Sequence, residues 1–161
     1  DVIFSETPVC RQMCEVYEKY GRPVVGVKPV SWELVRKYCS LKVEPIEGES
    51  TAYFCDDMIE KPKTDAEIFS NYSILGRVLV TPDIFDIIDA TPPGAGGEIQ
   101  LTDAIATLAR REGVTALDFE GKRFDLGSKL GFLEANVTAA LEHPEVSDRF
   151  KVFLTDLVNK M

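Results

Sequence analysis

A glycine-rich loop runs directly into a helical pattern in the stretch Pro92-Pro93-Gly94-Ala95-Gly96-Gly97-Glu98-Ile99-Gln100-Leu101-Thr102-Asp103-Ala104. Its glycines leave the backbone free to adopt positive φ angles and let another group approach without obstruction by a Cβ atom. The N–H groups of the following helix point back at the loop, and a helix start of this kind stabilises an anion. The stretch lacks the Lys-Ser/Thr pair of a P-loop. It therefore predicts either an anion-binding loop or an ordinary surface connection.

Strand and helix patterns alternate along the rest of the chain. Short β-branched runs at 23–28 and 72–80 predict buried strands, and the second is expected at the centre of the sheet. Hairpins are expected within 41–61 and between 114–119 and 122–125. Helices are expected at 8–20, 101–112, 128–142 and 147–159. The alternation predicts an α/β fold with a mixed, mainly parallel sheet flanked by helices.

Composition limits the class of protein. A chain of 161 residues with 45% hydrophobic content can bury a sizeable core, and its length predicts a single domain over residues 1–161. The net charge of -9 argues against non-specific binding to nucleic acid or to an anionic membrane. No apolar run approaches the roughly 20 residues of a membrane span, and no secretory signal pattern is present. We expect a cytoplasmic protein.

The cysteines show no metal-binding or disulfide pattern. Cys10, Cys14, Cys39 and Cys55 lack CxxC spacing, and the one histidine, His143, has no neighbour in sequence suited to metal binding. Reduced, mostly buried thiols are therefore favoured over a disulfide framework or a zinc site. Cys10 and Cys14 are one turn apart on the predicted helix, where a packing face is favoured over a metal site.

Several motifs in chain order, covering nearly the whole chain, resemble the family of bacterial-type UTP–glucose-1-phosphate uridylyltransferases, or UDP-glucose pyrophosphorylases. They are Asp1-Val2-Ile3, Glu60-Lys61-Pro62-Lys63, Ser70-Asn71 with Ile74-Leu75-Gly76-Arg77, residues 92–104, residues 120–131 and His143-Pro144-Glu145. The related thymidylyltransferases are less similar, since they typically carry an arginine at the position of Gly96.

The resemblance implies a fold of the nucleotide-diphospho-sugar transferase type, which is Rossmann-like. The family binds its nucleotide through an N-terminal glycine-rich loop with an Arg and a Lys, which the sequence lacks. The chain thus resembles the sugar-binding, C-terminal part, truncated on its N-terminal side and inactive alone. A truncated sheet exposes an apolar edge, so we expect a homo-oligomer or pairing with the missing N-terminal half.

The implied reaction transfers a uridylyl group from UTP to glucose 1-phosphate and releases pyrophosphate, with UDP-glucose as the product. Positioning and neutralisation of phosphate charge by Mg²⁺ and lysine are expected to dominate catalysis. The resemblance assigns Lys61 to catalysis, Glu60, Ile74, Glu98 and Lys129 to substrate binding, and Asp1 and Asp125 to Mg²⁺.

Structural alternatives stay open for these residues. Glu60 and Lys61 also fit a solvated strand end, Asp125 fits an ion pair with a neighbouring basic residue, and Glu98 fits a helix cap. The sequence departs from the family at Cys39, where a glycine normally approaches the sugar, and at Leu126, where a cysteine is usual. The functional alternatives are transfer to another hexose 1-phosphate or from another nucleotide, and a non-catalytic module that binds a sugar phosphate or forms oligomers.

Overall fold

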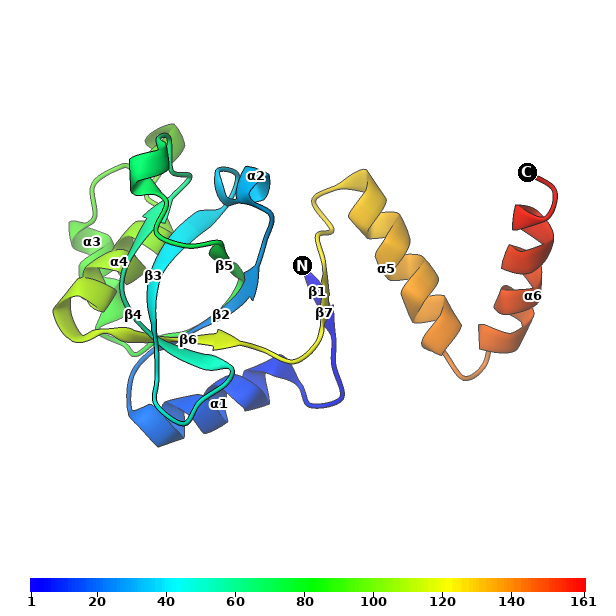
Figure 1. Ribbon diagram of the computed structural model, residues 1–161, viewed down its shortest axis with the longest axis horizontal. Helices are drawn as coiled ribbons and strands as arrows, with labels where there is room; N and C mark the ends of the chain where they lie inside the picture. Colours follow the sequence, from blue (N-terminus) through cyan, green and yellow to red (C-terminus); the bar gives the residue numbers. More distant parts are fainter. The chain divides into compact units, whose positions relative to one another are not determined.

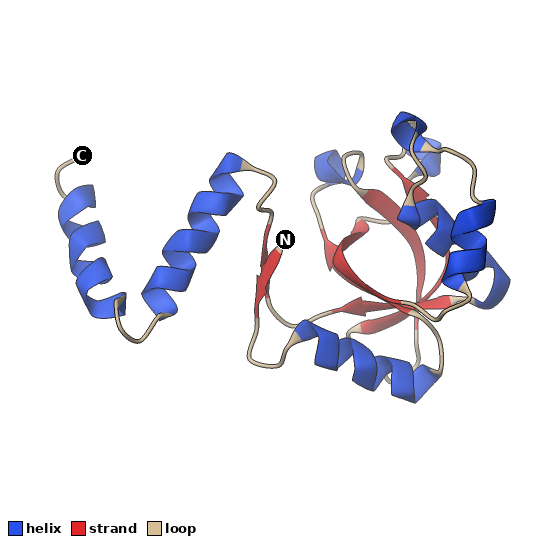
Figure 2. Cartoon of the chain, turned by 180° about the vertical axis from the view of Figure 1, so that it is seen from behind, coloured by secondary structure: helices blue, strands red, loops and turns tan.

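The computed structural model describes the backbone of residues 1–161 and every side chain except that of Ala95. It contains two compact units, one formed by Ser5–Gly121 and the other by Asp1–Phe4 with Lys122–Met161. Figure 1 labels their helices and strands, and Figure 2 separates helix from strand by colour. The division concerns compactness within one chain, so the prediction of a single domain stays a prediction.

The larger unit is built on a five-stranded sheet with the strand order β3-β4-β6-β2-β5. Its strands are β2 (Val24–Pro29), β3 (Cys39–Pro45), β4 (Ala52–Glu60), β5 (Tyr72–Leu79) and β6 (Val114–Asp118). Its helices are α1 (Val9–Tyr20), α2 (Trp32–Val35), α3 (Ile84–Ala90) and α4 (Leu101–Glu112), with short 3₁₀ turns at Asp65–Glu67 and Ala95–Gly97. The predicted α/β class, with a mixed sheet flanked by helices, is confirmed.

Three details of the predicted sheet are wrong. Parallel pairing does not predominate, because β2 and β6 form a parallel pair while β2–β5, β3–β4 and β4–β6 are antiparallel. The strand expected at the centre, β5, lies at the end of the strand order, and only Ser73 and Leu75 of its residues are buried. No hairpin joins 114–119 to 122–125, because β6 enters the sheet between β4 and β2. Pairing partners are chosen by tertiary packing, which a local pattern does not contain.

The apolar run at the start of β2 is explained by burial of this strand on both faces of the sheet. Val24 and Val25 are both completely buried, and successive side chains of a strand point to opposite faces, so helices must cover both faces. Val25 lies in a cluster with side chains of α3 and α4, whereas α1 packs on β2, β5 and β6 and buries Val9 and Met13. Figure 1 shows α1 on one side of the sheet and α3 and α4 on the other.

The sheet is curled, and its two outermost strands meet where they begin. The backbone N–H of Ile74 in β5 donates to Sγ of Cys39 in β3 at 3.2 Å, and the Ser73 hydroxyl donates to the Cys39 carbonyl. The buried hydroxyl of Ser40 accepts from the N–H of Ser70 at 3.1 Å and donates to its carbonyl at 2.9 Å. These bonds fix the start of β3 against the start of β5.

Gly113 ends α4, and both its backbone conformation and the space around it require a residue without a side chain. Its φ is +76°, and a Cβ atom would lie 2.2 Å from Cε2 of Phe54. We expect Gly113→Ala to lower the free energy of unfolding by about 3 kcal/mol, because an overpacking cost of about 1–3 kcal/mol adds to backbone strain.

Gly48→Ala is the matched control for Gly113→Ala. Gly48 has a φ of +80° but nothing within 4 Å of its Cβ position, so its substitution should cost about 1–2 kcal/mol of strain alone. Urea unfolding of the two variants measures the difference, and equal losses would show that Phe54 moves aside freely.

The smaller unit contains a two-stranded antiparallel ribbon and two helices. Its elements are β1 (Val2–Phe4), β7 (Lys122–Phe124), α5 (Lys129–Glu142) and α6 (Ser147–Val158). The rings of Phe4 and Phe124 meet edge to face at 5.6 Å. The Ser128 hydroxyl caps α5 by accepting from the N–H of Gly131 at 2.9 Å. Among the described residues, no helix combines the length and the apolar character that crossing a membrane requires.

Candidate functional site

Lys61 follows the last residue of β4 in a strained backbone conformation. Its φ of +46° is the one positive value outside glycine among the described residues. Such a conformation costs about 1–3 kcal/mol and persists only where the surroundings impose it. Here the N–H of Lys61 donates to the carbonyl of Tyr38 at 2.7 Å as the chain turns into Pro62. A strained residue at a strand end supports a functional role for Lys61.

The side chains of Glu60 and Lys61 differ sharply in exposure. Lys61 is 52% exposed, whereas Glu60 is 14% exposed, and Nζ of Lys61 lies 3.8 Å from Oε1 of Glu60. The ammonium group is therefore free to meet an anion from solvent, while the carboxylate beside it is held close to the protein surface. The pair places one positive and one negative group side by side at the end of β4.

Cys39 contacts both Glu60 and Ile74, two of the predicted substrate-binding residues. It pairs with Glu60 across β3 and β4, and its Sγ accepts from the N–H of Ile74. Burial, with a smaller contribution from the charge of Glu60, raises the pKa of the Cys39 thiol to about 12, although the hydrogen bond from Ile74 opposes the shift. The group is therefore a neutral thiol. Its sulfur accepts the hydrogen bond that the backbone N–H of Ile74 could otherwise donate to a ligand. Cys39 and Ile74 are 35 residues apart in sequence, so this contact was not predictable.

The glycine-rich loop folds on itself in front of α4. The N–H of Gly94 donates to the carbonyl of Glu98 at 2.8 Å, and a Cβ atom on Gly94 would lie 2.1 Å from Oδ2 of Asp103. A carboxylate in the first turn of α4 disfavours an anion there. The loop thus fits the structural alternative better than the anion-binding one. The Glu98 side chain is exposed and, within the described part of the chain, makes no hydrogen bond to α4.

An ion pair that sequence reasoning missed lies at the carboxyl ends of the parallel strands β2 and β6. Nζ of Lys28 is 2.7 Å from Oδ1 of Asp118 and 4.9 Å from the centre of the Phe119 ring. Carboxyl ends of parallel strands are common ligand positions in α/β proteins. The available signal was a charged residue directly after each of two buried apolar runs.

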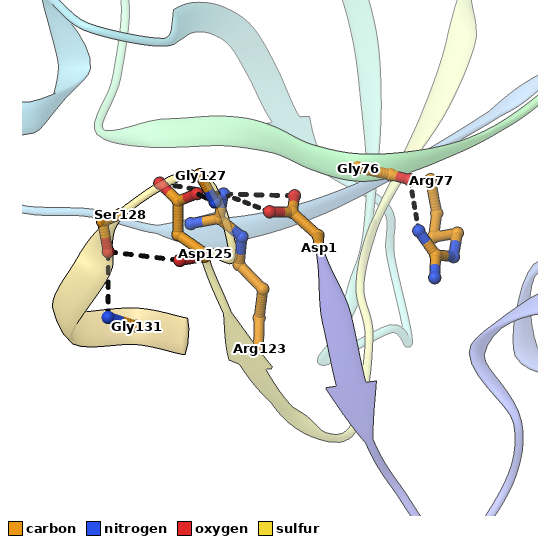
Figure 3. A network of polar contacts seen from close by, with 8 residues as sticks. All are labelled: Asp1, Gly76, Arg77, Arg123, Asp125, Gly127, Ser128 and Gly131. Atoms are coloured by element: carbon orange, nitrogen blue, oxygen red, sulfur yellow. Dashed lines mark hydrogen bonds and ion pairs between the residues drawn. The ribbon is translucent and has the colours of Figure 1, made fainter. Parts of the chain in front are cut away.

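The smaller unit brings the two predicted metal ligands onto one arginine, as Figure 3 shows. Nη2 of Arg123 lies 3.0 and 3.1 Å from the two carboxylate oxygens of Asp1, and 3.8 Å from Oδ2 of Asp125. The side chains of Arg123 and Asp1 are only 15% and 16% exposed. The alternative prediction of an ion pair between Asp125 and a basic neighbour is confirmed for Arg123.

The loop after β7 orients the Asp125 carboxylate. Its Oδ1 accepts from the N–H of Gly127 at 2.9 Å, and its backbone carbonyl accepts from the Ser128 hydroxyl at 3.1 Å. A Cβ atom on Gly131 would lie 2.2 Å from that carbonyl, so the first turn of α5 packs directly on the loop. Only a glycine at 131 permits this approach.

These carboxylates fit a magnesium ion better than a structural zinc. Mg²⁺ is commonly held by one or two carboxylates and keeps several waters, whereas structural zinc takes four protein ligands. The described residues include no group of three or more His, Cys, Asp or Glu side chains that could hold a metal. Asp1 and Asp125 supply two carboxylates. In their present arrangement Arg123 provides the compensating positive charge.

Lys129 is the first residue of α5 and borders a hollow of about 390 Å³, lined also by Leu126, Gly127, Ser128, Phe132 and Leu133.

The predicted residues form two clusters, one in each unit. The larger unit holds Glu60, Lys61 and Ile74 with Cys39, and the smaller unit holds Asp1, Asp125 and Lys129 with Arg123. Glu98 lies in the glycine-rich loop of the larger unit, outside the Cys39 cluster.

Comparison with known proteins finds curated relatives among the UTP–glucose-1-phosphate uridylyltransferases. The chain is 40% identical over 157 residues to a UTP–glucose-1-phosphate uridylyltransferase of Staphylococcus epidermidis, and 40% identical over 160 residues to one of Bacillus subtilis. These alignments cover 98% and 99% of this chain and 54% of each relative. The chain thus spans about half the length of the curated relatives that it matches. No protein-family model matches the sequence.

Solved structures agree with the sequence relatives. A UDP-glucose pyrophosphorylase complexed with UDP-glucose superimposes with a TM-score of 0.80 at 38% identity, over 88% of this chain and 53% of the other. A UTP-bound UGPase from Acinetobacter baumannii also gives a TM-score of 0.80, at 31% identity over 96% of this chain and 54% of the other. The resemblance and the fold type predicted from the motifs are confirmed.

Proposed function

We propose that this chain, a homologue of the UTP–glucose-1-phosphate uridylyltransferases over 98% of its length, supplies the glucose 1-phosphate side of a uridylyl-transfer site. The observation that carries the proposal is the strained Lys61 directly beside Glu60 at the end of β4. In the proposed reaction, a phosphate oxygen of glucose 1-phosphate attacks the α-phosphorus of UTP. A new P–O bond forms while the bond to pyrophosphate breaks.

Lys61 neutralises the sugar phosphate in this proposal. Its side chain is 52% exposed, so the ammonium group can reach a phosphate from a backbone position that is itself constrained. Glu60 accepts hydrogen bonds from the sugar hydroxyls. Because Cys39 already occupies the N–H of Ile74, Ile74 contributes apolar surface rather than a donor. Glu98 adds a second carboxylate for the sugar.

Asp1 and Asp125 are the proposed magnesium ligands, and Lys129 is a second phosphate-binding residue. A bound Mg²⁺ would offset negative charge that develops on the phosphates. Arg123 keeps the two carboxylates close together, because its positive charge offsets their mutual repulsion. Its role is to position the ligands.

The smaller unit favours assembly as part of the proposed function. Large apolar side chains are exposed on α5 and α6, namely Leu130, Phe132, Leu133, Val152, Phe153, Leu157 and Val158. Exposed apolar patches of this kind mark interaction surfaces. We propose that they are covered by a second copy of the chain or by the other part of a longer protein.

The proposal predicts that catalysis needs the other half of the relatives. A chimaera that joins this chain to the complementary half of the Bacillus subtilis relative should convert UTP and glucose 1-phosphate into UDP-glucose and pyrophosphate. The 161-residue chain alone should be at least about 10²-fold slower, because its sequence lacks the glycine-rich loop through which the family orients the nucleotide.

Coupled detection of pyrophosphate, with each protein at the same concentration, measures this difference. Rapid pyrophosphate release by the chain alone would contradict the division of labour. A folded chimaera that binds UTP but neither binds nor consumes glucose 1-phosphate would refute the proposed function.

A further inference from the structure

Two of the four cysteines are displayed on the surface of α1, where the sequence favoured a packing face. Cys10 and Cys14 are exposed free thiols, whereas Cys39 and Cys55 are buried, with exposures of 2% and 0%. The packing residues of this helix are Val9 and Met13. The expectation of a packing face at Cys10 and Cys14 is therefore wrong, because both side chains lie on the solvent side.

The first turns of α1 are held firmly beneath these thiols. Nε2 of Gln12 donates to the carbonyls of Thr7 at 2.8 Å and Glu120 at 3.0 Å, and its Oε1 accepts from the N–H of Glu120 at 2.8 Å. Gly21 closes the helix in the left-handed conformation. The spacing between the two thiols is therefore set by a regular, anchored helix.

Helical spacing favours a bridging ion over a disulfide. Side chains four residues apart have Cβ atoms about 5–6 Å apart. A disulfide requires Cβ atoms about 3.5–4.5 Å apart, so Cys10 and Cys14 cannot join directly without distortion of the helix. Two metal–sulfur bonds of about 2.3 Å each bridge the longer separation. The pair suits an atom placed between the sulfurs.

We propose that Cys10 and Cys14 form a two-thiolate binding site for a soft divalent cation such as Cd²⁺ on the outer face of α1. On binding, each S–H bond breaks, two metal–sulfur bonds form and two protons are released, without any change of oxidation state. Thiolates select soft ions and not Mg²⁺, so the site does not compete with the proposed magnesium carboxylates. Water or buffer anions complete the coordination.

Titration of the reduced chain with CdCl₂ tests this site. The readouts are the ultraviolet charge-transfer absorption of cadmium thiolates and the protons released per ion. We expect one tightly bound Cd²⁺ per chain with release of two protons. Cys10→Ser and Cys14→Ser should each lower the affinity at least about tenfold, the low end of what even an outer-shell substitution costs a metal site.

A double variant, Cys14→Ser with Glu15→Cys, is the matched control. It keeps the number of thiols but places the second one five residues after Cys10, on a different side of the helix. It should bind no more tightly than Cys14→Ser, and Cys55→Ala should bind as the original chain does. Equal affinity of the spacing control, unchanged affinity in either serine variant, or no charge-transfer band in the original chain would overturn the proposal.

Discussion

Lys61→Ala is expected to lower kcat about 10²–10³-fold in the chimaera, a loss of about 2.7–4 kcal/mol of transition-state stabilisation, as found when one preorganised donor to a developing charge is removed. The ammonium group is proposed to offset charge on the sugar phosphate. Lys61→Arg should restore only part of the rate, because a planar guanidinium does not fill the place of a compact ammonium group.

Lys61→Gly separates catalysis from stability at the same position. Glycine adopts positive φ without strain, so this variant should gain about 1 kcal/mol of stability relative to Lys61→Ala while it loses the same activity. Lys63→Ala, two residues further along, should be nearly silent in both respects because its side chain is exposed. Steady-state kinetics and thermal melts of the four variants test this. Equal activity losses at 61 and 63, or a collapsed melting temperature in Lys61→Ala, would show that the motif is structural.

Arg123→Met is expected to lower the free energy of unfolding by about 3 kcal/mol in the presence of EDTA, because it removes the partner of a largely buried ion pair and leaves the Asp1 carboxylate, which is 16% exposed, without compensating charge. Mg²⁺ should restore much of this loss, since an ion that binds only the folded state stabilises it. The original protein should respond less, because Arg123 already occupies the charge-compensating place.

Two controls separate charge compensation from general damage. Arg149→Met removes an exposed arginine from α6 and should change nothing. Adding Asp1→Asn to Arg123→Met removes one of the repelling charges, so it should recover stability in EDTA and weaken the response to Mg²⁺. Chemical unfolding with and without Mg²⁺ provides the data. A variant Arg123→Met that is indifferent to Mg²⁺ would mean that Asp1 and Asp125 do not hold the ion.

Element type was predictable from the sequence because its causes are local. Apolar periodicity and a terminal glycine located α4 at 101–112, and the structure begins and ends that helix at the same residues. The amphipathic pattern likewise located α5 to within one residue, 128–142 against Lys129–Glu142. Strand partners were not predictable. The run at 114–119 suggested a hairpin with its neighbour in sequence, but β6 lies between β2 and β4 and pairs with an edge of each.

The candidate site was predictable only where a motif carried it. The Glu60-Lys61 motif identified a strand end, but not the strain at Lys61, which arises from the bond to Tyr38. For Arg123 the sequence suggested only that it is one of several basic neighbours with which Asp125 could form an ion pair. Its main partner is Asp1, 122 residues away in sequence, and such a contact exists only once β1 and β7 pair. The ion pair between Lys28 and Asp118 was not predicted for the same reason, because it exists only once β2 and β6 pair.

The position of β6 also limits when the five strands can form a single sheet. Strand pairing joins the β2–β5 pair to the β3–β4 pair only through β6, although β6 is the last of the five strands to be synthesised. Its partner Val24 lies opposite Thr115, and the chain between them must be complete before the two can meet. Contacts this distant in sequence slow folding. The β2–β5 and β3–β4 pairs therefore cannot join into one sheet until residues 114–118 are present to pair with β2 and β4.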